Sequence, residues 1–556
     1  MQRSSSIAEQ FLQNYNSVYE ILASEFLLAR WNYFTDINNT DPAIWEIMGR
    51  ALEKFQGSKA VLDTFTFLDD SEELCEKDIR QVQKIMIAAG EAPQSKPNLT
   101  IKKQELHNIQ IQNYSKYQYS FQGNEVQKSM LLSVLKKSTD IKEREEAWNS
   151  LSRVSSSLFN NLDELRHARN TLAKEVDFPS YLDLQCADYG KTADEMYDWL
   201  QGMCNTVKPA YDQLFYKLEK NIQERFEVTT NGNLDIHLLQ NPWGQKWPEL
   251  NVTESELDTQ IEKKGSEWIV ESGLDFWSSL GLGSLDQEFI SNSDFYKKNE
   301  TDSRKKLGGA STWHINLDND IRSLMNIEPN LNWFGSLHHE LGHAYYYRAY
   351  SNKNVPVILR SGFCRAAQEA VGDLIRIASR QPRYLKRLGI QTSETDYEAS
   401  LLAEATNLAL PLFMFSAGSM FDLEYAIYSE ETPVHLLQDR WWGAVKKYQN
   451  LMPTSNRPNT QCDAFTKRHL TFSPGYYFNY GLSVAMSYQI YEHICCKILN
   501  QDPNDADFYG EKKVGDFLYD FMQLGATEPW DKTYRKMVGE DLSVEPMLRR
   551  FSKVLN

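Results

Sequence analysis

The sequence has few cysteines, few prolines and no excess of positive charge, and each shortage excludes a class of protein. Seven cysteines in 556 residues are scattered and odd in number, so neither a disulfide-stapled scaffold nor a zinc ribbon is indicated. Asp and Glu (76) outnumber Lys and Arg (59), and the formal net charge of -17 argues against a nucleic-acid partner. With 18 prolines and a 41% hydrophobic fraction, the chain is globular rather than disordered.

Long uniform hydrophobic runs are also missing, so we expect no membrane span. The most apolar stretch, 405–421, is shorter than the roughly 20 residues that a spanning helix needs, and it contains Asn407, Pro411 and Gly418. We predict a buried core helix there. No apolar segment of the signal-peptide type follows the first residues, which favours a cytoplasmic location, or a secreted one if this is a processed form.

Apolar residues recur at helical spacing along most of the chain, for example over 7–22 and 44–55. We therefore expect an all-α fold. One short region departs from this period, because residues 310–317 alternate between apolar and polar and 321–327 can pair back on them. A small antiparallel β element is predicted within 308–327.

The segment 337–344 contains the pattern H-E-x-x-H. On a helix His339 and His343 project from one face, which is the geometry that two ligands of a tetrahedral zinc ion need. Glu340, the next residue, can then take a proton from a water molecule at the metal. The sequence predicts one Zn²⁺ site per chain, and the alternative is a coincidental surface helix.

A zinc hydrolase needs a third protein ligand and an open position for water. Apolar residues over 367–378 trace one face of a second helix and leave Glu369 and Asp373 together on another face. We expect Glu369 to be the third ligand and Asp373 to accept the spare N–H of a ligand histidine. Without the upstream histidines, a solvated partner of Arg365 or Arg376 would be the better interpretation of Glu369.

The zinc motif, together with 356–360 and 368–373, resembles the angiotensin-converting-enzyme family of zinc peptidyl-dipeptidases. The likeness extends over most of the chain, with further matches at 31–37, 241–247, 441–449 and 467–480. The resemblance implies one catalytic domain over 1–556, with two interwoven helical subdomains that form a two-lobed ellipsoid around a deep central channel. It also implies substrates that are short peptides with a free C-terminus. We expect the protein to be a monomer.

The resemblance further implies a role for each matching residue. His339, His343 and Glu369 match the zinc ligands, and Glu340 matches the general base and acid. The remaining matches are Tyr480 for the oxyanion, His469 for a substrate carbonyl, Ala310 for the strand that aligns the peptide, and Gln245, Lys467 and Tyr477 for the C-terminal carboxylate. Tyr476 is an alternative to Tyr477, because the match requires a one-residue insertion.

Some positions depart from the family pattern. Gly309 stands where the family has a second carbonyl-binding histidine, and Val445 and Asn479 replace chloride-binding arginines, so we expect no chloride activation. Most of the cysteines that form the family's disulfides are missing, which fits either a reducing compartment or a divergent lineage. Gln245 is kept, and this favours dipeptide release over the release of single residues.

The expected reaction is therefore hydrolysis of the penultimate peptide bond, with Glu340 moving the proton. Two alternatives stay open. A thimet-type oligopeptidase shares the zinc motif and would cleave a C-terminally amidated peptide internally. A catalytically silent homologue would bind a peptide or partner without hydrolysing it.

Overall fold

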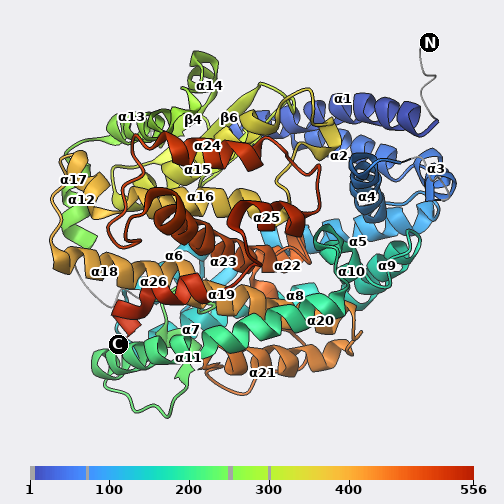
Figure 1. Ribbon diagram of the computed structural model, residues 1–556. Coiled ribbons are helices and arrows are strands. Elements are labelled where there is room, and N and C mark those ends of the chain that lie inside the picture. The colour runs from blue at the N-terminus through green and yellow to red at the C-terminus, as the bar shows by residue number, and fades with distance from the viewer. Residues whose placement is uncertain (1–6, 70–73, 248–253, 299–301, 556) are drawn as a thin grey trace. The chain divides into compact units, whose positions relative to one another are not determined.

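The computed structural model describes residues 7–69, 74–247, 254–298 and 302–555, and it is almost wholly helical (Figure 1). The predicted all-α fold is thereby confirmed. The chain divides into two compact units, each built from three separate segments. Unit 1 comprises Met1–Ser95, Thr253–Tyr397 and Met486–Leu542, and unit 2 comprises Lys96–Val252, Glu398–Ala485 and Ser543–Asn556. The single catalytic domain, the ellipsoid and the channel stay predictions.

Unit 1 begins with four helices and later contributes the helices that carry the zinc motif. Its longer helices are α1 (Ile7–Thr35), α2 (Pro42–Gln56), α3 (Lys59–Asp69), α4 (Glu76–Glu91), α12 (Glu254–Glu262), α13 (Ser266–Trp277), α15 (Leu331–Tyr350), α16 (Arg365–Ser379), α24 (Lys512–Met522) and α25 (Trp530–Val538). Short ones are η3 (Ser278–Leu282), α14 (Gln287–Asn292), η4 (Val357–Leu359), α17 (Pro382–Arg387) and η9 (Ile494–Leu499).

Unit 2 is built around α11 (Ala193–Phe226), whose start is fixed by a capping box between Thr192 and Glu195. Its other α-helices are α5 (Pro97–Ser115), α6 (Lys128–Lys137), α7 (Ile141–Ser152), α8 (Val154–Phe159), α9 (Leu162–Lys174), α10 (Tyr181–Cys186), α19 (Leu410–Phe413), α20 (Phe421–Tyr428), α21 (Leu437–Gln449), α22 (Arg468–Phe472) and α26 (Glu545–Leu555). Short turns of helix are η1 (Ala187–Tyr189), η2 (Ile236–Leu238), η5 (Ala405–Ala409), η6 (Met414–Met420), η7 (Val434–Leu436) and η8 (Asp463–Thr466). Two helices, α18 (Glu394–Glu404) and α23 (Phe478–His493), continue from one unit into the other.

The strands are short, and the largest sheet lies in unit 1. β5 (Ser311–His314) pairs antiparallel with β6 (Ile321–Ile327), with Thr312 opposite Ser323, so the β element expected within 308–327 is confirmed. β4 (Asp294–Tyr296) adds a parallel strand on the other edge of β6, which the sequence did not indicate. Unit 2 has a hairpin of β1 (Tyr119–Phe121) and β2 (Asn124–Val126), and a parallel pair of β3 (Leu234–Asp235) and β7 (Leu451–Met452).

The apolar stretch at 405–421 is a core segment of unit 2, as expected. It belongs to the helical run Glu394–Tyr428, which is long and apolar enough to cross a membrane by length and composition alone. Within its most apolar window, 72% of the residues are buried inside the structure. Burial of this kind is typical of the core helix of a globular protein.

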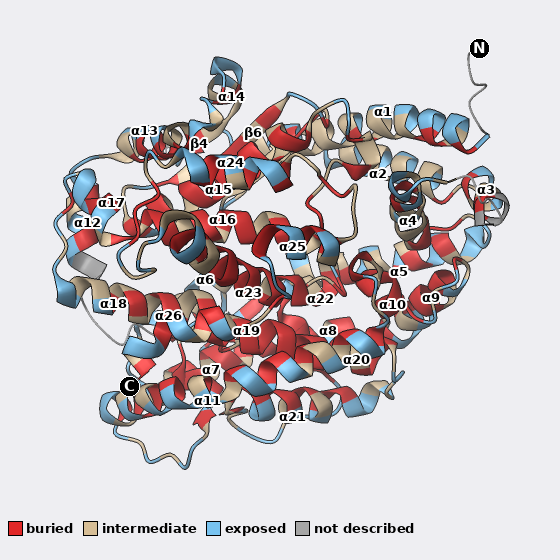
Figure 2. Cartoon of the chain, in the orientation of Figure 1, coloured by how far each residue is buried: buried red, intermediate tan, exposed pale blue. Residues whose placement is uncertain are grey.

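Helices α15 and α16 pack side by side in unit 1 (Figure 1). α15 begins after Asn330, whose side chain accepts a hydrogen bond from the Trp333 N–H. Most residues of α15 are buried, whereas α16 is amphipathic and turns its apolar face to the core (Figure 2). The two helices therefore form a rigid base for the polar side chains between them.

Candidate active site

Two glycines allow α15 and α16 to approach backbone to backbone. A Cβ atom added to Gly342 would lie 3.0 Å from the Gly372 Cα atom. A Cβ atom added to Gly372 would lie 2.7 Å from the Nδ1 and Cε1 atoms of His339. The 2.7 Å distance is shorter than real Cβ contacts, and the 3.0 Å distance would require a neighbour to shift, so the position of the His339 ring depends on glycine at 372.

The three predicted metal ligands lie together between these helices. His339 and His343 come from α15 and Glu369 comes from α16, and one ligand atom from each lies within 4.8 Å of the others. The two Nε2 atoms are 3.1 Å apart, and the Glu369 Oε2 atom is 3.4 Å from the His339 Nε2 atom. Ligands of a tetrahedral zinc ion with bonds of about 2.0–2.1 Å lie about 3.4 Å apart, so this donor set fits zinc.

Asp373 fixes the orientation of the His339 ring. Its Oδ1 atom is 3.0 Å from the His339 Nδ1 atom and 3.2 Å from the Arg376 guanidinium. Burial and Arg376 lower the pKa of His339, but the carboxylates of Asp373 and Glu369 outweigh them and raise this pKa to about 9. The contact leaves the Nε2 atom directed at the metal position, as expected for a partner of a ligand histidine.

The sequence did not reveal the partner of Glu340. The Thr312 hydroxyl on β5 donates to the Glu340 Oε2 atom at 2.9 Å, and the Ser323 hydroxyl on β6 lies 2.9 Å from the Thr312 oxygen. Glu340 is buried, so these hydroxyls restrict its carboxylate to one orientation. The only sequence signal was indirect: the sequence predicted a β element within 308–327, and its register, with Thr312 opposite Ser323, is seen only in the structure.

Ala310 lies directly before β5 rather than within it, because the strand begins at Ser311. The nearby Gly309 carbonyl accepts a hydrogen bond from the Asn326 amide of β6 at 3.1 Å, so this segment still follows the sheet. The role of Ala310 in aligning a peptide stays a prediction.

The three residues expected to bind a carboxylate lie together in unit 2. The Gln245 Oε1 atom accepts from the Lys467 ammonium at 2.6 Å and from the Tyr477 hydroxyl at 2.8 Å. All three side chains are buried. Of the two tyrosines left open by the sequence, Tyr477 is therefore the one bonded to Gln245.

His469 and Tyr480 lie beside this trio in the same unit. The His469 ring centroid is 4.8 Å from that of Tyr477 and 6.1 Å from that of Tyr480. Burial, with the positive charges of Lys467 and Arg468, lowers the pKa of His469 to about 3. His469 is thus a neutral imidazole near pH 7, which can donate one hydrogen bond.

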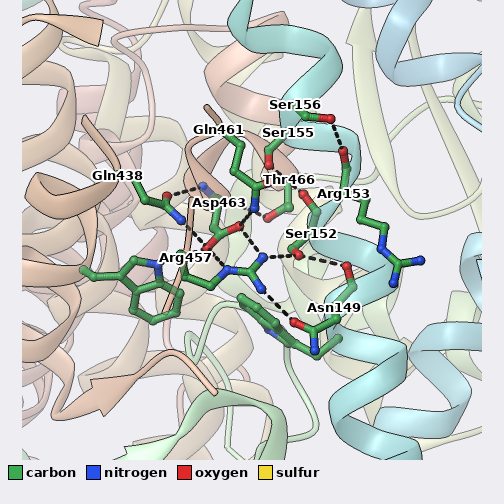
Figure 3. Close-up of polar contacts among 12 residues, drawn as sticks. Asn149, Ser152, Arg153, Ser155, Ser156, Gln438, Arg457, Gln461, Asp463 and Thr466 are labelled. Carbon is green, nitrogen blue, oxygen red and sulfur yellow. Dashed lines mark hydrogen bonds and ion pairs between the residues drawn. The ribbon is translucent and has the colours of Figure 1, made fainter. Parts of the chain in front are cut away.

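A buried polar cluster holds the turn that precedes Lys467 (Figure 3). The Asp463 carboxylate accepts from the guanidinium of Arg457 at 2.9 Å and from the Gln438 amide at 2.7 Å. Arg457 also donates to the Asn149 oxygen at 2.7 Å. The ion pair is satisfied on both sides, so it anchors η8 and the start of α22. Arg457 and Asp463 were not identified from the sequence.

Val445 and Asn479 stand where the family has chloride-binding arginines, and both side chains are buried. The Asn479 amide accepts from the Tyr189 hydroxyl at 2.5 Å and donates to the Tyr476 carbonyl at 2.7 Å. All seven cysteines belong to the described residues, and each is a free thiol. The absence of chloride activation stays a prediction.

The two groups of residues thus belong to different units, with the predicted metal ligands, Glu340 and Asp373 in unit 1 and the carboxylate-binding trio in unit 2.

The sequence profile of the angiotensin-converting enzyme family matches residues 2–556. The chain is 26% identical over 431 residues to the angiotensin-converting enzyme of Haematobia irritans exigua, covering 73% of this chain and 69% of that protein. It is 24% identical over 590 residues to the enzyme of Sus scrofa, covering 98% of this chain but only 43% of that protein. The enzyme of Theromyzon tessulatum is 25% identical over 447 residues, covering 77% of this chain and 71% of that protein. The chain therefore belongs to the angiotensin-converting enzyme family.

Proposed function

We propose that the chain is a zinc peptidyl-dipeptidase, which removes dipeptides from the free C-terminus of short peptides. The observation that carries this proposal is the cluster of His339, His343 and Glu369 with the Glu340 carboxylate beside it. Two neutral imidazoles and one carboxylate, with room for water, are the donor set of catalytic zinc sites. A zinc ion bound there supplies Lewis-acid activation of a water molecule.

Glu340 is the proton carrier in this proposal. Its Oε2 atom is held by Thr312, which leaves Oε1 to accept a proton from the attacking water and return it to the departing amine. Tyr480 supplies a phenolic hydroxyl and His469 a ring N–H for the oxygen of the scissile bond. Hydrogen bonds of this type are worth about 10²–10³ in rate each.

Gln245, Lys467 and Tyr477 define the end of the peptide. An ammonium group with two neutral donors suits a single carboxylate, and burial strengthens the attraction. Lys467 is the one cation of the trio and Gln245 and Tyr477 are neutral, so the trio fits the single main-chain carboxylate at the end of a peptide. Gln245, which the family's carboxypeptidase branch replaces by arginine, favours release of two residues over release of one.

The test is a digest of an unmodified decapeptide followed by mass spectrometry, with and without a chelator. We expect sequential loss of dipeptides from the C-terminus, abolished by the chelator. Glu340→Gln should keep stoichiometric zinc and lose turnover, whereas the exposed control Glu288→Gln should keep both. Internal cleavage of an amidated peptide would favour the oligopeptidase instead. Zinc binding without hydrolysis of any peptide would favour the silent homologue.

The comparisons do not support the expectation of a cytoplasmic location. The expectations of a monomer and of no chloride activation stay predictions. Both can be measured on the same preparation, by light scattering and by turnover with and without added chloride.

A further inference from the structure

A second cation lies beside the carboxylate-binding trio of unit 2. The Lys467 ammonium is 4.3 Å from the ring centroid of Trp243, and the Lys128 ammonium is 6.0 Å from the same centroid. Lys128 starts α6 and donates to the Tyr114 hydroxyl at 2.6 Å. Tyr114 in turn donates to the Thr466 carbonyl, directly before Lys467. The two ammonium groups are thus held against one indole by connected hydrogen bonds.

Within the described part of the chain, this group of cations forms no ion pair with a carboxylate. The cations are Lys128, Lys467 and Arg468. Burial and the nearby Arg468 lower the pKa of Lys128 to about 8. Burial lowers the pKa of Lys467 too, with further lowering by Lys246, Lys128 and Arg468. Partly buried cations that repel one another are costly unless an anion joins them.

One peptide carboxylate cannot balance this cluster. In the proposed function the C-terminal carboxylate meets Lys467, which leaves Lys128, half-buried, and Arg468, exposed, without a partner of opposite charge. An extended dipeptide spans about 7 Å, so a side chain from either of its residues can extend from Lys467 to the Lys128 ammonium, which lies 6.0 Å from the centroid of the same Trp243 ring. A second negative group on the substrate would therefore complete the site.

We propose that Lys128 selects peptides whose C-terminal dipeptide carries an Asp or Glu side chain. This inference rests on the proposed function, because the substrate enters the same trio. The carboxylate of that side chain would accept from the Lys128 ammonium beside the Trp243 ring, with Arg468 adding a solvent-screened attraction. Lys128 therefore affects which peptides are preferred and takes no part in the hydrolysis step.

The experiment compares matched peptides that differ only in charge. Peptides with Asp or Asn at the last position, and others with Asp or Asn at the penultimate position, are assayed for kcat/KM. We expect a preference of roughly tenfold for Asp over Asn at one of the two positions, which corresponds to about 1.4 kcal/mol. The position that shows the preference identifies which side chain meets Lys128.

Variants then connect the preference to Lys128. Lys128→Gln should reduce the Asp/Asn ratio to about one. Lys128→Glu should bring this ratio below one and should favour a peptide whose C-terminal dipeptide contains Lys. Lys136→Gln, which changes an exposed lysine at the other end of α6, should leave the ratio unchanged. An Asp/Asn ratio near one in the unaltered protein, or a ratio that Lys128→Gln leaves intact, would overturn the proposal.

A binding measurement separates this proposal from the proposed function. Calorimetry with the product dipeptides Ala-Asp, Asp-Ala, Ala-Asn and Asn-Ala reports on the trio and Lys128 without any turnover. If no peptide is hydrolysed but an acidic dipeptide binds more tightly in a Lys128-dependent way, the peptidase function fails and the acidic subsite stands. If peptides are hydrolysed with no Lys128-dependent preference in either assay, the subsite fails alone.

Discussion

Replacing Gly372 by Ala tests how tightly the helix pair controls the metal ligands. The new Cβ atom would lie 2.7 Å from the His339 Nδ1 and Cε1 atoms, whereas ordinary contacts begin near 3.4 Å. The ring, or helix α16 that carries Glu369, must therefore move by about 0.7 Å, which exceeds the roughly 0.2 Å tolerance of a zinc–ligand bond. The Asp373 contact would be strained by the same movement.

We expect Gly372→Ala to weaken zinc binding at least 10–100-fold, as loss of a ligand-orienting contact does, and to lower stability by about 1–3 kcal/mol through overpacking. The assay is competition with a chromogenic chelator, and thermal unfolding with and without zinc measures the second effect. Gly443→Ala is the matched control, because it lies in α21 with nothing within 4 Å of its added Cβ atom. Unchanged zinc affinity in Gly372→Ala would refute the argument from close packing.

Three further predictions concern other side chains. Thr312→Val should lower kcat about 10-fold or more with little change in KM or zinc content, and Thr312→Ser should restore it; equal losses in both variants would show that the hydroxyl is not the cause. Asp373→Asn should weaken zinc binding about 10–100-fold, measured by chelator competition, because the His339 ring loses its charged partner. Burial raises the pKa of Glu424 to about 7 from 4.5, so the folded chain keeps a proton that the unfolded chain releases. Its contribution is therefore full below about pH 4.5 and lost as the pH rises towards 7, by up to about 3 kcal/mol. Urea unfolding at pH 5 and pH 8 should show that the free energy of unfolding decreases less with pH in Glu424→Gln than in the unaltered protein. The same decrease in both proteins would contradict this prediction.

The cluster of His339, His343 and Glu369 was predictable because its residues follow a local rule. His339 and His343 are one helical turn apart, and Glu369 and Asp373 repeat that spacing on an amphipathic helix. The same reasoning predicted helices over most of the chain and the pairing of β5 with β6, since period and alternation are properties of neighbouring residues. Gln245, Lys467 and Tyr477 came from resemblance, and the structure brings their side chains together.

The remaining features depend on residues that are far apart in the sequence. Arg457 meets Asn149 only after α7 and the segment before η8 have packed, and no local pattern predicts such a pair. Lys128 shares the Trp243 ring with a lysine more than 300 positions later. The parallel strand β4 also pairs through tertiary packing. Residue propensity and hydrophobic periodicity do not predict contacts between residues that are far apart in the sequence.

The division of unit 1 into three segments affects how the protein acquires its metal during synthesis. Helix α24 packs on α15, and the Phe521 ring lies 6.2 Å from the Tyr346 ring, directly beyond the zinc motif. The ribosome makes the last of the proposed ligand residues, Glu369, well before it makes Phe521, and at about 5–20 residues per second the interval is roughly 8–30 s. Over that interval the nascent chain carries two histidines and a glutamate on α15 and α16, while α15 still lacks its contact with α24. If the proposed zinc site is correct, we therefore expect zinc to be bound late in synthesis, and a chain interrupted before α24 would carry the motif without its contact with that helix.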